Sequence, residues 1–334
     1  MVESLALIGL TIRMTWGGEM KIVLSCLAVV ASLSNSWQLA AQASCRISVP
    51  VIALASGPTI GFAANDLHGT VKGHEITIKG IKPQPATRRF VFVLDRSGSM
   101  VGVRTPPDSL ARFDLNRLMR QDVEEALDAI PSGDSVAFLA FSGEDSKQTD
   151  FASLDAARAE APSISAWRPG KGIHRTPLWD NIEIALQMLG SHEAGDVIVV
   201  VSDGRDNLSK LPMDKVQADL LRASVPVLAI LIADPGAPTP EEGAGPGDFA
   251  RLAAATGGAT AVGDKRLAGI FPLGTLLFQP NQLIPLLGHQ YELEMETPPI
   301  QKPEKWNLRA NSPAAGRKLD LLYPRYLQPC TEMH

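Results

Sequence analysis

Two continuous apolar runs, each ending at or next to an aspartate, constrain the fold of this chain more than any other feature. Residues 90–94 are all apolar and lead directly into Asp95, and residues 197–201 lead through Ser202 into Asp203. A strand that is apolar at every position is typical of a parallel sheet covered by helices on both faces. In such sheets, ligands bind at the carboxyl ends of the strands. The two aspartates are therefore candidates for one shared site.

The sequence around these runs alternates between helix and strand patterns. Over residues 115–130, apolar side chains recur mostly every three or four positions, Asp114 can cap the helix, and a Pro-Ser-Gly sequence can end it. Further helices are expected over residues 155–161, 178–189, 214–223 and 248–255, and further strands over residues 136–141, 225–232 and, more weakly, 148–154. The alternation predicts an α/β domain with a mostly parallel sheet and helices on both faces. Residues 234–247, rich in Pro, Gly and Glu, are expected to form a mobile loop.

Short β-type runs at both ends of the chain predict small β-strand appendages to this domain. They lie at residues 47–54 and 75–81 before it and at 291–295 and 318–323 after it. Pro83-Gln84-Pro85 is the expected linker. The chain then divides into four parts. Residues 1–43 form an N-terminal extension with a signal peptide, and residues 44–85 form a β appendage with its linker. Residues 86–290 form the α/β domain, and residues 291–334 form a C-terminal β segment.

The N-terminal sequence predicts a secretory signal. From Met20, one positive charge precedes an apolar run at residues 22–33, and small residues offer a cleavage site after Ala41 or Ala43. The residues before Met20 would then be an upstream extension. The alternative is a single membrane anchor, for which the apolar run is short. We therefore expect a secreted or periplasmic protein.

Two cysteines, Cys45 and Cys330, would remain after cleavage, one near each end of the mature chain. In an oxidising compartment an even pair favours a disulfide, which would tie the two β segments together. Two free thiols remain the alternative.

Composition excludes several classes of function. The net charge is −5, and the sequence has no basic cluster interleaved with aromatic residues, so a nucleic-acid partner is not expected. The apolar stretch at residues 269–288 contains three prolines, and no other internal run is long enough to span a membrane. We expect no membrane span in the mature chain.

The loop after the first apolar run carries oxygen ligands at alternate positions. Asp95, Ser97 and Ser99 form an Asp-x-Ser-x-Ser sequence in which Gly98 would permit a tight turn. Thr176 offers a further hydroxyl just before the helix expected at 178–189. Hard oxygen donors of this kind suit Mg²⁺, with Mn²⁺ or Ca²⁺ as possible substitutes.

These residues together resemble the metal-ion-dependent adhesion site of von Willebrand factor type A domains. The resemblance covers roughly residues 86–290, and the flanking β segments look like those of bacterial secreted members of the family. It implies a Rossmann-like, doubly wound sheet and a divalent cation with one coordination position left for an acidic residue of a protein or peptide partner. The implied ligands, direct or through water, are the hydroxyls of Ser97, Ser99 and Thr176 and the carboxylates of Asp95 and Asp203.

One position departs from the family pattern. Members commonly carry glycine just before the threonine, and here that residue is Arg175. Its bulk and charge would either weaken metal binding or help to hold an acidic ligand.

Other residues near the motifs have less specific interpretations. Asp206 is either part of the rim of the site or, more simply, a solvated loop acid, and His174 is expected on the surface. Trp167 and Trp179 are expected to pack in the core. The insertion at residues 101–112 either shapes partner choice or is a plain connecting loop.

The leading functional hypothesis is a divalent-cation-dependent binding module of the adhesion type outside the cytoplasm, and not an enzyme. The sequence has no Gly-x-Ser-x-Gly elbow, no phosphate-binding Gly-x-x-x-x-Gly-Lys-Ser/Thr loop and no His-Glu-x-x-His. One alternative is a structural module of an envelope assembly, with the metal serving stability only. Another is a metal-dependent hydrolase in which Asp95 or Asp203 activates a bound water, although no separate general base is apparent.

Overall fold

The structure is a computed structural model of the chain. It describes residues 44–54, 63–84, 87–100, 103–104, 113–168, 175–232, 240–262, 277–312 and 317–330. The predicted signal peptide, most of the insertion at 101–112, and His174 lie outside these residues.

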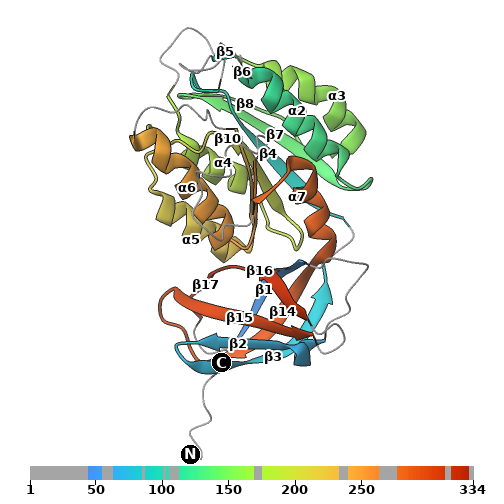
Figure 1. Ribbon diagram of the computed structural model, residues 1–334, viewed down its shortest axis with the longest axis vertical. Coiled ribbons are helices and arrows are strands. Elements are labelled where there is room, and N and C mark those ends of the chain that lie inside the picture. Colours follow the sequence, from blue (N-terminus) through green and yellow to red (C-terminus); the bar gives the residue numbers. More distant parts are fainter. Residues whose placement is uncertain are drawn as a thin grey trace, which may run out of the picture. The chain divides into compact units, whose positions relative to one another are not determined.

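A mostly parallel sheet forms the centre of the α/β domain, as the apolar runs predict (Figure 1). Its order is β13-β12-β11-β10-β4-β7-β8, and every pairing is parallel except that of the edge strand β8 with β7. The bounds are Arg89–Asp95 (β4), Ser135–Ser142 (β7), Asp145–Gln148 (β8), Val197–Ser202 (β10), Val227–Leu231 (β11), Thr260–Val262 (β12) and Leu277–Phe278 (β13). Strand β4 lies between β10 and β7, so the two apolar runs are direct neighbours.

Helices cover both faces of this sheet. Phe90, Phe92 and Leu94 point into one apolar cluster, whereas Val91 and Val93 point into the other, because successive side chains of a strand face opposite ways. The first cluster contains residues of α2 (Leu115–Asp128), α3 (Leu154–Ala166) and α7 (Pro280–Leu286), and the second contains residues of α4 (Leu178–Met188), α5 (Met213–Ala223) and α6 (Pro240–Ala255). The doubly wound fold is therefore confirmed.

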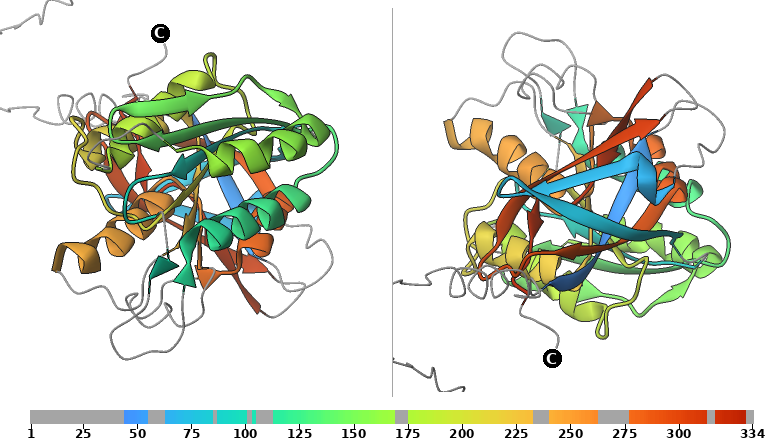
Figure 2. Two further views of the ribbon diagram at one scale, coloured as in Figure 1. Left: turned by 90° about the horizontal axis from the view of Figure 1, so that it is seen from above. Right: turned by 90° about the horizontal axis from the view of Figure 1, so that it is seen from below.

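Strands from both ends of the chain form a second, antiparallel sheet. Its order is β16-β1-β14-β3-β2-β15-β17, and an added pairing of β16 with β15 closes the sheet on itself. In the view from below, the blue N-terminal strands lie among the red C-terminal strands (Figure 2), with β1 between β16 and β14 and the pair β3-β2 between β14 and β15. The bounds are Cys45–Leu54 (β1), Leu67–Val71 (β2), His74–Pro83 (β3), Gln290–Thr297 (β14), Glu304–Ser312 (β15), Arg317–Leu322 (β16) and Tyr326–Leu327 (β17). The appendages are thus one closed sheet with its own apolar core.

A disulfide joins Cys45 to Cys330, with the two Cα atoms 6.0 Å apart. The backbone of Cys330 also exchanges two hydrogen bonds with Ile300. The first alternative of the sequence analysis, a bridge that ties the two β segments, is therefore confirmed.

Backbone contacts connect the closed sheet to the α/β domain. At the point where the chain leaves and re-enters the closed sheet, the amide of Gln84 donates to the carbonyl of Gln290 at 3.1 Å and extends the pairing of β3 with β14. The amide of Arg325 donates to the carbonyl of Ala255 at the end of α6, at 2.9 Å. Gly257 has a φ of +84°, and a Cβ there would come within 2.8 Å of Pro324, so only glycine fits this contact.

Three expectations about individual elements are wrong, and one strand of the closed sheet was missed. Helix α3 continues through Pro162 to Ala166 instead of ending at residue 161. Helix α6 begins at Pro240, inside the expected loop, because proline suits a first helical turn. The strand expected at 148–154 is replaced by two short strands that pair with β7, namely β8 and β9 (Ala152–Ser153). Strand β15 was not expected at all.

Two shorter helical segments and one short hairpin complete the described chain. They are the 3-10 turns Ala64–Asp66 and Leu287–His289 and the pair β5 (Val103–Arg104) and β6 (Phe113–Asp114). No helix among the described residues is long and apolar enough to cross a membrane.

Candidate metal centre

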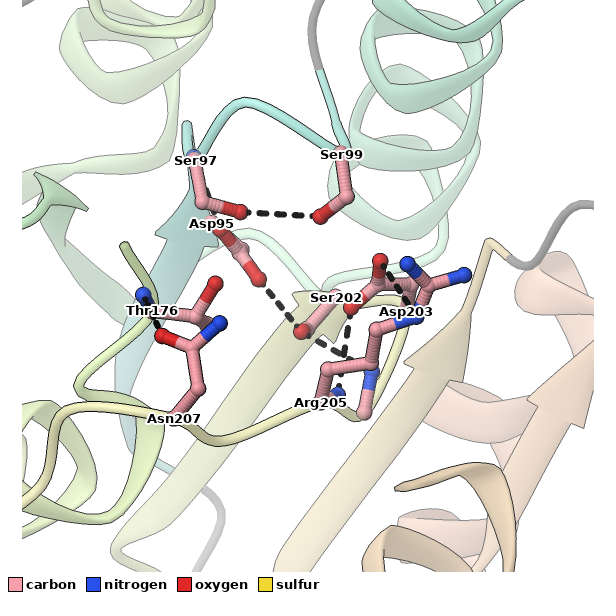
Figure 3. Close-up of polar contacts among 9 residues, drawn as sticks. Asp95, Ser97, Ser99, Thr176, Ser202, Asp203, Arg205 and Asn207 are labelled. Carbon is pink, nitrogen blue, oxygen red and sulfur yellow. Dashed lines mark hydrogen bonds and ion pairs between the residues drawn. The ribbon is translucent and has the colours of Figure 1, made fainter. Parts of the chain in front are cut away.

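The carboxyl ends of β4 and β10 bring Asp95 and Asp203 to the same edge of the sheet. The two strands pair in parallel, with Val201 opposite Leu94, so the next residues of each strand leave the sheet side by side. Asp95 is 0% exposed and Asp203 is 4% exposed. Figure 3 shows these two side chains with those of Ser97, Ser99 and Thr176 around one space at this edge.

The loop after β4 turns its hydroxyls toward that space. The amide of Ser97 donates to Asp95 Oδ1 at 2.9 Å, and the Oγ atoms of Ser97 and Ser99 lie 3.1 Å apart. The amide of Met100 donates to the carbonyl of Ser97, which completes the turn. Gly98 is not among the described glycines with a positive φ, so this turn does not depend on the conformational freedom of glycine.

Ser202 holds the second oxygen of Asp95. Its hydroxyl donates to Asp95 Oδ2 at 2.6 Å and accepts from the amide of Gly204 at 3.0 Å (Figure 3). The sequence analysis missed this role. The available signal was a polar residue at the end of an otherwise apolar strand, where a buried hydroxyl needs a partner.

The electrostatics of the site favour a bound cation. Burial and, to a smaller extent, the charge of Asp203 raise the pKa of Asp95 to about 7, although hydrogen bonds from Ser202 and Ser97 partly offset both effects. Two buried carboxylates at one edge are costly unless a positive charge lies between them. In the part of the chain that the structure describes, no group of three or more His, Cys, Asp or Glu side chains is able to hold a metal ion. A metal here would therefore need the hydroxyls as ligands, and the all-oxygen donor set fits Mg²⁺.

Thr176 is positioned by a loop from the other side of the site. Its amide donates to the side chain of Asn207 at 2.8 Å, and the amide of Asn207 donates to the Thr176 carbonyl at 3.0 Å. This pair of bonds ties the segment before α4 to the loop after β10. Thr176 is 2% exposed, and all five predicted residues thus reach the same edge of the sheet.

Asp206 is neither a solvated acid nor part of the rim. It is half-buried, and its Oδ1 accepts from the amide of Leu178 at 2.8 Å, in the first turn of α4. Burial raises its pKa, and hydrogen bonds from Ser209 and from backbone amides lower it. Asp206 therefore caps α4 from a separate segment.

Three arginines lie close to the motif in sequence, and each has a different environment. Arg96 is 1% exposed and donates to Asn116 at 2.6 Å and to the carbonyl of Trp167, and burial lowers its pKa to about 10. Arg175 is exposed and donates to the carbonyl of Asn207. Arg205, which the sequence analysis did not single out, lies beside Asp203, with Nε 3.4 Å from Oδ2 (Figure 3).

The expectations for both tryptophans are confirmed. Trp179 is 7% exposed within the apolar cluster that α4, α5 and α6 share, and Trp167 packs against the cluster on the other face.

Comparisons with known proteins agree with this fold. Residues 90–245 match the family model of the von Willebrand factor type A domain. This matched segment contains all five predicted site residues. A search of curated proteins found no match.

Similar solved structures cover larger parts of the chain at low identity. A von Willebrand factor type A protein from Catenulispora acidiphila is 13% identical, with 85% of this chain and 73% of that chain covered and a TM-score of 0.40. The ArnB paralog VWA2 from Sulfolobus acidocaldarius is 12% identical, with 85% and 76% covered and a TM-score of 0.38. Proximal thread matrix protein 1 from the mussel byssus is 14% identical, with 65% and 49% covered and a TM-score of 0.42.

Proposed function

We propose that this chain is a protein- or peptide-binding module of the adhesion type, dependent on a divalent cation and working outside the cytoplasm. Residues 90–245 carry a von Willebrand factor type A domain, a type of domain that generally serves protein interaction and not catalysis. The observation that carries the proposal is the pair of buried carboxylates, Asp95 and Asp203, at one sheet edge together with three hydroxyls.

The proposed ligands are the five residues of this edge, and each is held by its own part of the fold. Asp95 is fixed through both oxygens, by the amide of Ser97 and the hydroxyl of Ser202. Thr176 is fixed through Asn207. Because the protein's own groups hold these donors, the donor set is largely preorganised, which lowers the ordering cost of binding.

The expected cation is Mg²⁺, with Mn²⁺ or Ca²⁺ as substitutes. When bound, it would supply positive charge and an open coordination position for a carboxylate of the partner. Three of the five donors are neutral hydroxyls, so much of the charge of the cation would remain uncompensated. An acidic residue on the partner is therefore the expected ligand.

The disulfide supports a location outside the cytoplasm. Stable structural disulfides are rare in reducing compartments, and Cys45–Cys330 links strand β1 to the segment that follows β17. Together with the signal-like sequence after Met20, it favours a secreted or periplasmic protein.

A second candidate function is a structural module of an envelope assembly. The closed sheet has an apolar core of its own and could make the contacts, with the metal serving stability only. If capture of a partner is unaffected by EDTA and by substitution of Asp203, this second candidate is favoured.

Metal-dependent stability provides the direct test of the proposal. Mg²⁺ at ten times its dissociation constant is expected to raise the free energy of unfolding by about 1.4 kcal/mol, because it binds the folded state alone. The test compares urea unfolding in MgCl₂ and in EDTA for the wild type and for Asp203→Asn. Asparagine keeps an acceptor for the amide of Arg205, which donates to Asp203 Oδ1 at 3.1 Å, so the loop is preserved.

The matched control is Asp150→Asn, which removes an exposed carboxylate outside the site. The wild type and the control should respond to Mg²⁺, and Asp203→Asn should not. If the wild type unfolds identically in MgCl₂ and in EDTA, the proposed dependence on a divalent cation is wrong.

A further inference from the structure

Asp203 is paired with an arginine of its own loop. Arg205 Nε lies 3.4 Å from Asp203 Oδ2, and the amide of Arg205 donates to Oδ1. The side chains of Asp203 and Arg205 are only 5% and 17% exposed. Both oxygens of a proposed metal ligand thus face the same residue (Figure 3).

The backbone of the loop keeps Arg205 in this place. Gly204 has a φ of +79°, a conformation that other residues rarely adopt, and a Cβ there would come within 2.7 Å of the carbonyl oxygen of Gly245 in α6. A Cβ on Gly245 would in turn meet the carbonyl of Gly204 at 2.8 Å. Because the loop and α6 approach so closely, the turn that presents Arg205 to Asp203 has little room to change.

The other two arginines near the motif do not hold a site carboxylate in this way. The guanidinium of Arg96 binds Asn116 on α2, and that of Arg175 binds the carbonyl of Asn207. Arg175 is also exposed, so water and salt screen its charge. The charge of Arg205 is partly buried against Asp203 and is screened much less.

We propose that Arg205 is an internal competitor of the divalent cation: its guanidinium neutralises Asp203 in the metal-free protein and thereby sets the metal affinity of the site. This inference rests on the proposed function. A cation bound at Asp203 has to share that carboxylate with a positive charge a few ångströms away, and the repulsion between the two lowers the affinity. The pair also stabilises the metal-free state, so that binding has to exchange one counter-ion for another.

Isothermal titration of the full chain with MgCl₂, after removal of metals with EDTA and dialysis, tests this competition. Arg205→Gln is expected to lower the dissociation constant for Mg²⁺ at least about fivefold, because it removes the competing charge and keeps a side chain of similar length. Arg205→Lys restores the charge and is expected to bind Mg²⁺ within about twofold of the wild type.

Two controls separate this effect from general changes in charge and from failure of the site itself. Lys210→Gln removes one positive charge from an exposed position of the same loop and should leave the affinity unchanged. Asp203→Asn should abolish binding in both the wild-type and the Arg205→Gln background. Thermal unfolding of each variant in EDTA checks that it is folded before the titration.

The outcomes are distinguishable. Tighter binding by Arg205→Gln but not by Lys210→Gln supports the inference, including the case in which only Arg205→Gln binds measurably. Equal or weaker binding by a folded Arg205→Gln, with a wild type that does bind, overturns the inference and leaves the proposed function standing. Absence of Mg²⁺ binding by every folded variant overturns both.

Discussion

At the scale of single residues, the site is a set of buried polar groups that hold one another in place, partly across segments far apart in the sequence. Asp95 has its two oxygens held by Ser97 and Ser202, and Thr176 is held by Asn207. Each contact satisfies a group that would otherwise be costly to bury. The same contacts restrict the positions of Asp95 and Thr176 at the edge of the sheet.

A buried carboxylate away from the site gives a test of the electrostatics. Asp122 on α2 is 5% exposed, and burial, with a smaller effect of Glu125, raises its pKa to about 7. The folded state therefore binds this proton more tightly than the unfolded state, and stability falls as pH rises from about 4 to about 7. Asp122→Asn should remove this loss.

We expect Asp122→Asn to raise the free energy of unfolding by on the order of 2 kcal/mol at pH 8, and by little at pH 4. Urea unfolding at several pH values measures the difference. Glu124→Gln, an exposed acid on the same helix, serves as the control and should show no such trend. A difference between Asp122→Asn and the wild type that is constant with pH would contradict this explanation.

At the scale of elements, the loop after β10 contacts both the candidate site and helix α4. Its Asn207 positions Thr176, while Asp206 accepts from the amide of Leu178 in the first turn of α4. Pro177, which precedes the helix, provides no side-chain cap, so the cap comes from a distant segment. The stability of α4 and the geometry of the site are therefore coupled through one loop.

Asp206→Ala should lower the free energy of unfolding by about 1–3 kcal/mol, because it leaves an amide of the first turn of α4 without its acceptor. Urea unfolding measures the loss, with Asp150→Ala as an exposed control. If the two substitutions cost the same, Asp206 is not the cap of α4.

The elements also show what can be predicted from sequence. Strands β4, β7 and β10 were predictable because each contains a continuous apolar run, and helix α2 because its period, its cap at Asp114 and its stop all agree. Strand β15 was missed because only every second residue is buried, in a segment rich in charged residues. Helices α3 and α6 were misjudged because each contains a proline that the tertiary structure accommodates.

The site was predictable to the extent that its residues form a spaced pattern. Asp95, Ser97, Ser99, Thr176 and Asp203 could be named from sequence, and all lie at one edge of the sheet. Ser202, Asn207 and Arg205 could not be assigned, because their roles depend on which segments the fold brings together.

At the scale of the whole molecule, the chain is organised as an α/β domain inserted between the two halves of a closed antiparallel sheet. Strands β1 to β3 precede the domain and β14 to β17 follow it, and the two groups are interleaved in the sheet. Neither group has a complete set of partners without the other. The disulfide Cys45–Cys330 links these two groups.

Removal of the disulfide tests this organisation. The Cys45→Ser/Cys330→Ser variant should lose about 2–5 kcal/mol of stability, since the unfolded chain loses a crosslink that spans most of its length. Urea unfolding with and without reductant measures the effect, and the reductant should destabilise the wild type but not the variant. An insensitive wild type would show that the bond contributes nothing to stability.

The central claim is that a divalent cation binds among five oxygen donors at the carboxyl edge of β4 and β10. The most direct measurement is an anomalous difference map from crystals grown in MnCl₂, since Mn²⁺ is an acceptable substitute for Mg²⁺ at hard oxygen sites. We predict one peak within the space bounded by Asp95, Ser97, Ser99, Thr176 and Asp203, and its loss in Asp203→Asn. A well-ordered site without a peak, or with the metal bound elsewhere, would contradict the claim.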